Sequence, residues 1–284
     1  RSPFNGASQY GERKLSMKGF DHGNRGIGVR DHQLILPSVV CSTRVSSRIA
    51  KEIGAITFAH QHGCGFIGND VGRITEYFAA LANHPNVSST LVVGLGCETI
   101  QGNELADKLL AKNKSTNYLV TQESGGVQGT VDTGVAAAKA LQAYYQPTPV
   151  VLPRLHLGID LSNDDLKVDE IVAALTNVGV DITVAASHKN SGLNFSDLME
   201  SGVHVILSFP DGNQPASGFP LIPTINVASD SPLHLALSDD FDLKAGATSE
   251  EIMEKIYAVI NGELTKVEAI GAGEIIAGRE VRSV

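Results

Sequence analysis

Short apolar runs alternate with helix-length segments along most of this chain, and that alternation restricts its fold more than any other feature. In the first half we expect strands at 34–40, 55–59, 90–95 and 118–121. Each is followed by a helical pattern, at 42–53, 69–81, 103–112 and 127–145. Strands that alternate with helices of ten or more residues are typical of βαβ units and a parallel sheet.

The same alternation continues in the second half. Strands are expected at 150–158, 181–186, 203–209 and 225–228, and helices at 166–178, 195–200 and 249–261. Ser249 is expected to cap the last helix and Gly262 to end it. The apolar runs are continuous, which is typical of strands whose two faces are both covered. The sequence therefore predicts an α/β protein with two Rossmann-like parallel-sheet units and helices on both faces.

The segment Gln146-Pro147-Thr148-Pro149 is the expected boundary between the units, because each proline blocks helix continuation. We therefore expect a first α/β unit at 33–146 and a second at 147–284. Residues 1–32 are rich in glycine and show no clear periodicity. They are expected to form an N-terminal loop segment, which is either a flexible leader or a cover for an anionic ligand held by Arg25 and Arg30.

Composition narrows the class of protein. The chain has 22 basic and 31 acidic residues, a formal charge of −9, which argues against a nucleic-acid surface. No apolar run approaches the roughly 20 residues that span a bilayer, so no membrane insertion is expected. Three widely spaced cysteines favour a reducing compartment, and we expect a cytoplasmic location. A homo-oligomer is compatible with the sequence, which does not fix the oligomeric state.

All three cysteines follow expected strands by one to five residues. Because ligands bind outside the carboxyl ends of strands in open α/β sheets, Cys41, Cys64 and Cys97 are expected on one rim. His60, His62 and Glu98 belong to the same corners. This mixture of ligands suits Fe(II), our first expectation, or Zn(II), and three thiolates suit an iron–sulfur cluster. The alternative for each cysteine is a small apolar filler of the core.

Two glycine-rich corners indicate other ligands. Residues 63–68 match G-x-G-x-x-G between a strand and a helix, but no acidic residue closes the next strand, so a nicotinamide site is incomplete. Gly125 and Gly126 precede an expected helix, whose N-terminus would favour a carboxylate. An ordinary glycine turn explains the same pair.

Several motifs occur in a fixed order: Gly19-Phe20-x-x-Gly23-x-x-Gly26-Ile27-Gly28-Val29-Arg30, Val40-Cys41, His62-Gly63-Cys64-Gly65, His84-Pro85-Asn86-Val87, Gly94-Leu95-Gly96-Cys97-Glu98 and Gln122-x-x-Gly125-Gly126. Together they resemble the altronate/galactarate dehydratase family, which also includes sulfolactate sulfo-lyase. The C-terminal segment Asp242-Leu243-Lys244-Ala245-Gly246 is similar to the same family. Where the family carries Gly-Ser-Asp-x-x-Ser-Gly, this chain has residues 158–163, and its central region is shorter.

The resemblance implies a metal-dependent hydro-lyase that removes water from a sugar acid or related hydroxy acid, such as altronate or galactarate. Such an elimination needs a base beside the carboxylate and a Lewis acid at the departing hydroxyl. We expect the metal ligands to come from this set: Cys41, Cys64, Cys97, His62 and Glu98. The expected catalytic residues are His60 (the base), His62 and Glu98.

Arg25, Arg30, Gly125 and Gly126 are expected to hold the substrate carboxylate. The departures in the central region leave a second hypothesis, a non-catalytic relative that binds a small carboxylate or supports a partner subunit.

Overall fold

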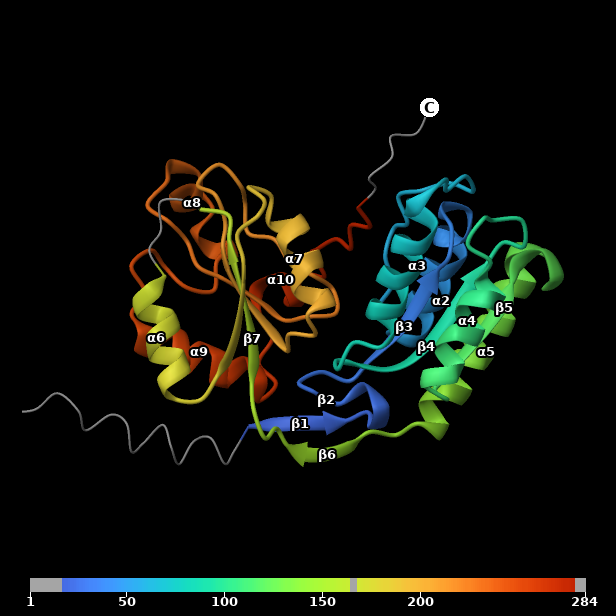
Figure 1. The fold of residues 1–284 in the computed structure, drawn as a ribbon, viewed down its shortest axis with the longest axis horizontal. Coiled ribbons are helices and arrows are strands. Elements are labelled where there is room, and N and C mark those ends of the chain that lie inside the picture. Colours follow the sequence, from blue (N-terminus) through green and yellow to red (C-terminus); the bar gives the residue numbers. More distant parts are fainter. Residues whose placement is uncertain (1–16, 164–167, 279–284) are drawn as a thin grey trace, which may run out of the picture. The chain divides into compact units, whose positions relative to one another are not determined.

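The computed structural model describes residues 17–163 and 168–278, which divide into two compact units (Figure 1). One unit contains all three cysteines and is called the cysteine unit; its described residues are 22–26, 31–148 and 274–278. The second unit comprises 17–21, 27–30 and 149–273, without 164–167. Each unit is built on a parallel sheet, which confirms the expected α/β class.

The sheet of the cysteine unit has the order β3-β4-β5, with strands β3 (His32–Pro37), β4 (Val87–Gly94) and β5 (Thr116–Val120). Helices α2 (Thr43–Ile53) and α5 (Gly126–Tyr144) pack together on one face, and α3 (Asn69–Ala82) and α4 (Gly102–Lys112) on the other (Figure 1). Because both faces are covered, β3 and β4 are buried almost throughout, which explains their continuous apolar runs.

The strand expected at 55–59 is reduced to a single parallel bridge between Ile56 and Leu34. Ile56 still donates to the Gln33 carbonyl at 2.9 Å and accepts from Ile35 at 2.8 Å. Beyond it the backbone N–H of His60 donates to the Thr43 hydroxyl instead of continuing the ladder. The apolar run therefore marks a partly buried segment that leaves the sheet early.

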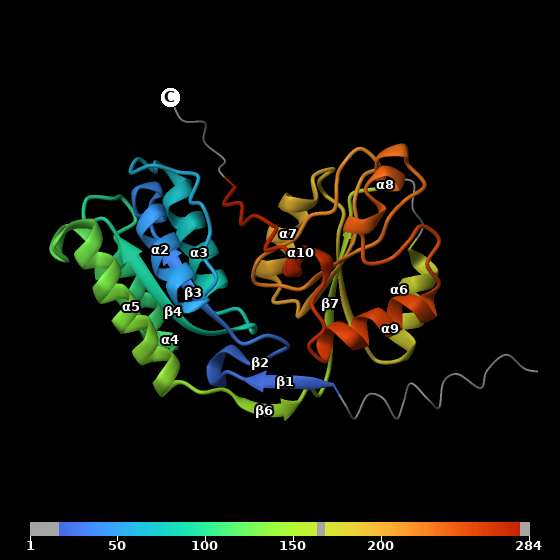
Figure 2. The same cartoon turned by 180° about the vertical axis from the view of Figure 1, so that it is seen from behind.

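The sheet of the second unit has the order β10-β9-β7-β8, and its strands are β7 (His156–Leu161), β8 (Asp181–Ala185), β9 (Val205–Phe209) and β10 (Thr224–Asn226). All pairings in it are parallel. Helix α7 (Ser191–Glu200) packs on β7, β8 and β9, and α6 (Asp169–Asn177) packs against α9 (Ser249–Ile260) on the opposite face (Figure 2). Two short helices, α8 (Pro232–Ala236) and α10 (Lys266–Ala269), complete the unit.

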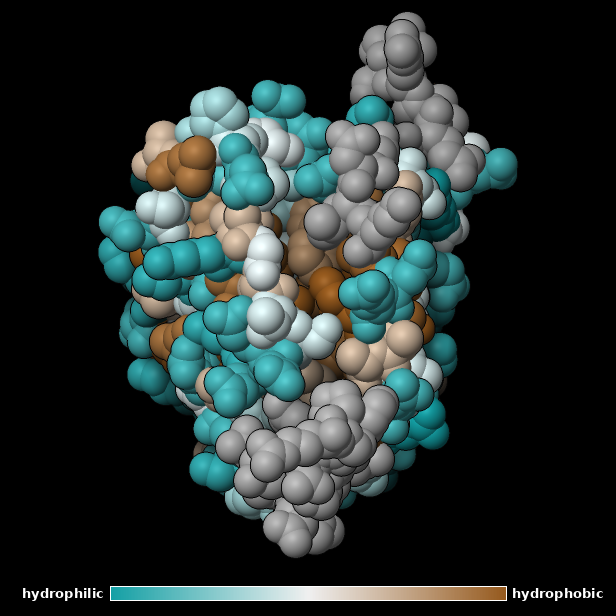
Figure 3. All heavy atoms as spheres, turned by 90° about the vertical axis from the view of Figure 1, so that its left-hand side faces the viewer, coloured by the Kyte–Doolittle hydropathy of each residue, from teal (hydrophilic) through white to brown (hydrophobic). Residues whose placement is uncertain are grey.

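The face of the second unit that carries α6 and α9 has apolar residues gathered between polar ones (Figure 3). Leu175 of α6 and Ile256 of α9 belong to the core beneath it. The packed helices α6 and α9 therefore cover one side of the sheet.

Part of the expected N-terminal loop segment is strand. β1 (Lys18–Asp21) pairs antiparallel with β2 (Ile27–Gly28), and β6 (Thr148–Val151) joins them in the order β2-β1-β6. Residues 1–16 of that expected segment lie outside the described residues. The single strand expected at 150–158 is split into β6 and β7, because Pro153 between them has no N–H for a ladder.

No helix among residues 17–163 and 168–278 is long and apolar enough to cross a bilayer.

Candidate functional site

The loops that follow β3, Ile56, β4 and β5 meet at the carboxyl edge of the sheet in the cysteine unit. We call loops 38–42, 57–68, 95–101 and 121–126 the rim. The Val40 N–H donates to the His62 carbonyl at 3.0 Å, and the Thr99 N–H donates to the Cys64 carbonyl at 3.2 Å. The Gln122 N–H donates to the Leu95 carbonyl at 3.1 Å, which links the third loop to the fourth. These backbone bonds hold the cysteine corners next to one another.

The three cysteines are free thiols, and none is fully buried. Cys41 lies in a 3-10 turn at Val40–Ser42 and is exposed, as is Cys97, whose Sγ accepts from the Gln122 amide at 3.7 Å. Cys64 is half-buried, and its carbonyl accepts from both the N–H and the hydroxyl of Thr99. This accessibility differs from that of an apolar core filler.

The expected metal ligands do not form a metal site in this arrangement. Among the described residues, no group of three or more His, Cys, Asp or Glu side chains is placed to hold a metal ion. We therefore assign no reaction step to a metal. Metal binding by Cys41, Cys64, Cys97 and His62 stays a prediction.

Glu98 is 3% exposed and shapes the turn after β4. Its Oε1 accepts from the Ser38 hydroxyl at 2.9 Å and from the Leu95 N–H at 3.1 Å, and its Oε2 accepts from the Gly96 N–H at 2.6 Å. Burial alone would raise the pKa of this carboxyl, but the bonds from the Gly96, Glu98 and Leu95 amides and from Ser38 outweigh it, so the pKa is lowered. Glu98 is therefore an ionised acceptor at neutral pH.

His60 lies in an aromatic pocket and is 2% exposed. Its ring stacks on Phe58 and meets the ring of Phe78 edge-on, with centroids 6.2 and 5.3 Å away. The Nδ1 atom accepts from the His62 backbone N–H at 3.0 Å. In the neutral imidazole the proton is then on Nε2, because Nδ1 is an acceptor.

His62 is half-buried and its tautomer is fixed by a carbonyl. Its Nε2 lies 2.7 Å from the Ala277 carbonyl oxygen, which can only accept, so Nε2 carries the proton and Nδ1 has the lone pair. Gln61 beside it donates to the Ile275 carbonyl at 2.8 Å. The segment 274–277 is thus fastened to the second loop of the rim.

Gly125 and Gly126 begin helix α5 at the fourth loop. Both have left-handed φ angles, +74° and +79°, and both are exposed. A Cβ atom at either position would meet nothing within 4 Å, so the space above the helix N-terminus is open. The 19-residue helix α5 therefore begins at an exposed point of the rim.

Arg25 is buried in the cysteine unit with 5% exposure. Its Nε donates to the Ala82 carbonyl at 2.7 Å, and its Nη1 donates to the Ser88 carbonyl and the Ser115 hydroxyl. Burial lowers its pKa to about 10. These contacts tie the 22–26 segment to the core and are those of a structural arginine.

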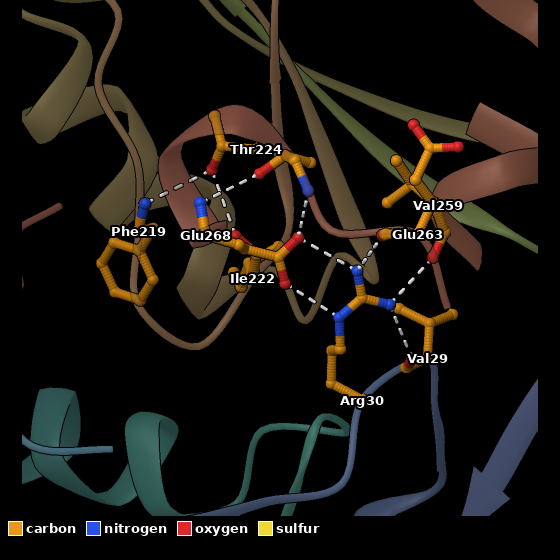
Figure 4. Close-up of polar contacts among 9 residues, drawn as sticks. Val29, Arg30, Phe219, Ile222, Thr224, Val259, Glu263 and Glu268 are labelled. Atoms are coloured by element: carbon orange, nitrogen blue, oxygen red, sulfur yellow. Dashed lines mark hydrogen bonds and ion pairs between the residues drawn. The ribbon is translucent and has the colours of Figure 1, made fainter. Parts of the chain in front are cut away.

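Arg30 is buried in the second unit, and all five of its donors are used (Figure 4). Nε and Nη2 form a bidentate pair with Glu268 at 2.8 and 3.0 Å. The remaining bonds go to the carbonyls of Val29, Val259 and Glu263. No donor of Arg30 is left for a substrate carboxylate, so its geometry supports a structural role rather than the expected binding role.

Sequence reasoning missed two polar contributors to the rim. Ser38 is 1% exposed and donates to Glu98, while the Thr43 hydroxyl accepts from the His60 N–H at 3.2 Å. A usable signal for Ser38 was its position directly after β3, where side chains reach the carboxyl edge.

The fold defines an α/β protein whose loops meet at the carboxyl edge of a parallel sheet. Residues 19–146 match the family described as D-galactarate dehydratase/Altronate hydrolase, second domain, and residues 166–283 match D-galactarate/Altronate dehydratase, C-terminal. The chain belongs to this dehydratase family, as the motif order predicted.

Two curated relatives are similar to parts of the chain. Altronate dehydratase of Bacillus subtilis (strain 168) is 30% identical over 144 residues, which is 46% of this chain and 28% of the relative. Altronate dehydratase of Escherichia coli (strain K12) is 30% identical over 105 residues, 33% of this chain and 21% of the relative. Each alignment thus spans less than a third of the relative.

Proposed function

We propose that this chain is a hydro-lyase that removes water from a sugar acid or a related hydroxy acid, such as altronate or galactarate. The observation that carries the proposal is the rim itself. In a chain of a dehydratase family, it brings an imidazole, three accessible thiols and an open helix N-terminus to one sheet edge. Names of the two relatives support the substrate class.

The proposed reaction starts with removal of the proton on the carbon beside the carboxylate. We assign the base to His62 rather than to His60. The Ala277 carbonyl holds the His62 proton on Nε2, so Nδ1 of the half-buried His62 offers its lone pair. His60 is 2% exposed among aromatic rings, where a substrate does not reach its ring directly. His60 is then a positioning residue for the loop that carries the base.

The carboxylate is assigned to the Gly125-Gly126 turn. Exposed amides at the N-terminus of α5 favour an anion through their hydrogen bonds and the helix dipole. Glu98 keeps the Gly94–Cys97 turn in place as an ionised acceptor, so we assign it a positioning role. The β-hydroxyl leaves as water with the proton that His62 Nδ1 has taken up, and the resulting enol rearranges to a 2-oxo acid.

The test is incubation of anaerobically purified protein with a panel of sugar acids, with and without added Fe(II). Formation of the 2-oxo-3-deoxy acid is followed by NMR, which also detects one solvent deuteron at C3 in D2O. We expect turnover of at least one acid and a loss of about 10²-fold or more in His62→Gln. The matched control is His188→Gln, in the second unit. Turnover that is unchanged in His62→Gln would contradict the assignment of the base.

The second candidate is a non-catalytic relative that binds a small carboxylate or supports a partner subunit. The shorter central region, with residues 158–163 in place of the family's Gly-Ser-Asp-x-x-Ser-Gly segment, favours it. Isothermal titration with the same acids distinguishes the two candidates. Saturable binding without product under all metal conditions supports the binding-only function.

A further inference from the structure

A second reactive arrangement lies in the second unit, at the carboxyl ends of its sheet. A cavity of about 180 Å³ opens there beside the ends of β9 and β10. Its apolar lining includes Phe209, Val227 and Ile171. Its polar lining includes Asn163, Ser229 and Asp230. This edge is the usual place for a ligand in an open parallel sheet.

Ser229 is hydrogen-bonded to a buried histidine. Its Oγ lies 2.8 Å from Nδ1 of His234, a residue with 0% exposure. Nε2 of His234 lies 2.8 Å from the Gln214 carbonyl, which can only accept. Nε2 therefore carries the ring proton, and Nδ1 accepts from both the hydroxyl and the N–H of Ser229.

This arrangement fixes the direction of the Ser229 hydroxyl, which must donate to Nδ1. The histidine is in turn oriented by a third group, the Gln214 carbonyl. A hydroxyl that donates to an oriented imidazole is the geometry of an activated serine nucleophile. We propose that Ser229 is a nucleophile toward a small, uncharged carboxylic ester, lactones included, that enters this cavity.

The charge of the lining supports an uncharged ligand. Asp230 contributes a carboxylate, and none of the described residues that line the cavity is basic. The charge among these residues therefore favours an uncharged ligand over an anionic sugar acid. The Asn163 carboxamide is a neutral donor in the lining that suits an ester carbonyl.

The reaction balances with water as the second reactant. Ser229 Oγ attacks the ester carbonyl carbon while its proton passes to Nδ1 of His234, and that proton then goes to the departing alkoxide oxygen. The products are an acyl-serine and an alcohol. If the ester is a lactone, the alcohol stays attached to the acyl group on the serine. Water attacks the acyl carbon, gives its proton to Nδ1, and Oγ recovers that proton as the acid leaves.

The first experiment treats the full chain with a small ethyl fluorophosphonate, which phosphonylates an activated serine and releases fluoride. Peptide mass spectrometry is expected to place the added mass on Ser229. Ser229→Ala should abolish labelling, and His234→Gln should slow it about 10²-fold or more. Ser231→Ala is the matched control, because Ser231 caps α8 and accepts from the His234 backbone N–H at 3.1 Å, whereas the ring nitrogens bond to Ser229 and Gln214.

The second experiment measures hydrolysis of δ-valerolactone by proton release, with wild type, Ser229→Ala and Ser231→Ala. We expect hydrolysis only in wild type and Ser231→Ala. Wild-type protein that takes no label, or label and hydrolysis that persist in Ser229→Ala, would overturn the proposal. These outcomes depend on wild type and on Ser229→Ala, a change at a half-buried position. They therefore decide the question even if a substitution of the fully buried His234 prevents folding. They are also independent of sugar-acid turnover at the rim.

Discussion

Glu98 shows how a single buried carboxylate organises a loop of the rim. Three of its bonds come from the Ser38 hydroxyl and the amides of Leu95 and Gly96. The same residue leaves little room nearby, because a Cβ atom on Gly94 would lie 2.7 Å from Glu98 Oε1. The glycine and the carboxylate are therefore required together, and the turn depends on both.

We expect Glu98→Gln to destabilise the protein by about 2–3 kcal/mol, because an amide NH2 replaces one acceptor and faces a backbone donor. Urea unfolding at pH 7 measures the loss. Glu104→Gln, an exposed change in the first turn of α4, is the control and should have little effect. Because the folded pKa of Glu98 is lowered, the difference between wild type and Glu98→Gln should shrink only as the pH falls below about 4.5. A constant difference down to pH 2 would contradict this role.

The candidate site could be predicted from the sequence only in part. Cysteines placed just after apolar runs predicted the common rim, since parallel strands end at one edge. The roles of Arg30 and Glu98 depended on partners that no local pattern reveals: Arg30 pairs with Glu268, 238 residues away, and Glu98 with Ser38, 60 residues away. Sequence spacing indicates which loops meet, but tertiary packing decides which side chains keep free donors.

At the scale of elements, the residue type alone does not show which side chain caps a helix. The cap depends on the geometry of that side chain. The sequence predicted Ser249 as the cap of α9, but Thr248 holds that position. Its hydroxyl accepts from the Glu251 N–H at 3.2 Å, and Glu251 accepts from the Thr248 N–H at 2.8 Å, which forms a capping box. Adjacent Ser and Thr residues are both favourable N-caps by type, so the pattern located the helix start only to within one residue.

Thr248→Ala should therefore destabilise the second unit by about 1 kcal/mol, whereas Ser249→Ala should change its stability little. The two substitutions differ by one position and remove the same kind of group. Chemical denaturation of both variants beside wild type is the measurement. Equal losses in both, or a larger loss in Ser249→Ala, would mean that the cap lies at Ser249.

His156 begins β7 and His204 directly precedes β9, and this pair of histidines predicts acid sensitivity. The His156 N–H donates to His204 Nδ1 at 3.0 Å, and the rings are 6.4 Å apart. Burial, together with the charge of His156, lowers the pKa of His204 to about 4 from 6.5. The unfolded chain thus binds this proton more readily than the folded one, and folding is destabilised as pH falls from about 6.5 toward 4.

We expect the stability lost between pH 7 and pH 4 to be smaller in His204→Gln than in wild type, by up to about 3 kcal/mol. Unfolding midpoints in urea across this range measure the difference. His188→Gln serves as the control, because His188 is the more exposed residue. Parallel pH profiles for wild type and His204→Gln would show that His204 does not cause the acid sensitivity.

At the scale of the whole molecule, the chain passes between its two units several times. Residues 17–21 and 27–30 belong to the second unit, while 22–26 and 274–278 belong to the cysteine unit. One of these passages, between Thr148 and Pro149, lies at the proline segment 146–149. Short segments such as 22–26 gave no signal, because they carry too few residues to show a period.

Fragments provide the test of this organisation. A fragment of residues 33–146 lacks Arg25, whose buried guanidinium bonds the Ala82 and Ser88 carbonyls, and it lacks Ala277, which accepts from His62. Because these buried acceptors would lose their partners, we expect the fragment to unfold without a cooperative thermal transition and to bind a hydrophobic dye. The full chain should melt cooperatively, and Arg25→Met in the full chain should lower its melting temperature. A 33–146 fragment that melts as sharply as the full chain, at the same temperature, would show that these outlying segments are dispensable to the cysteine unit.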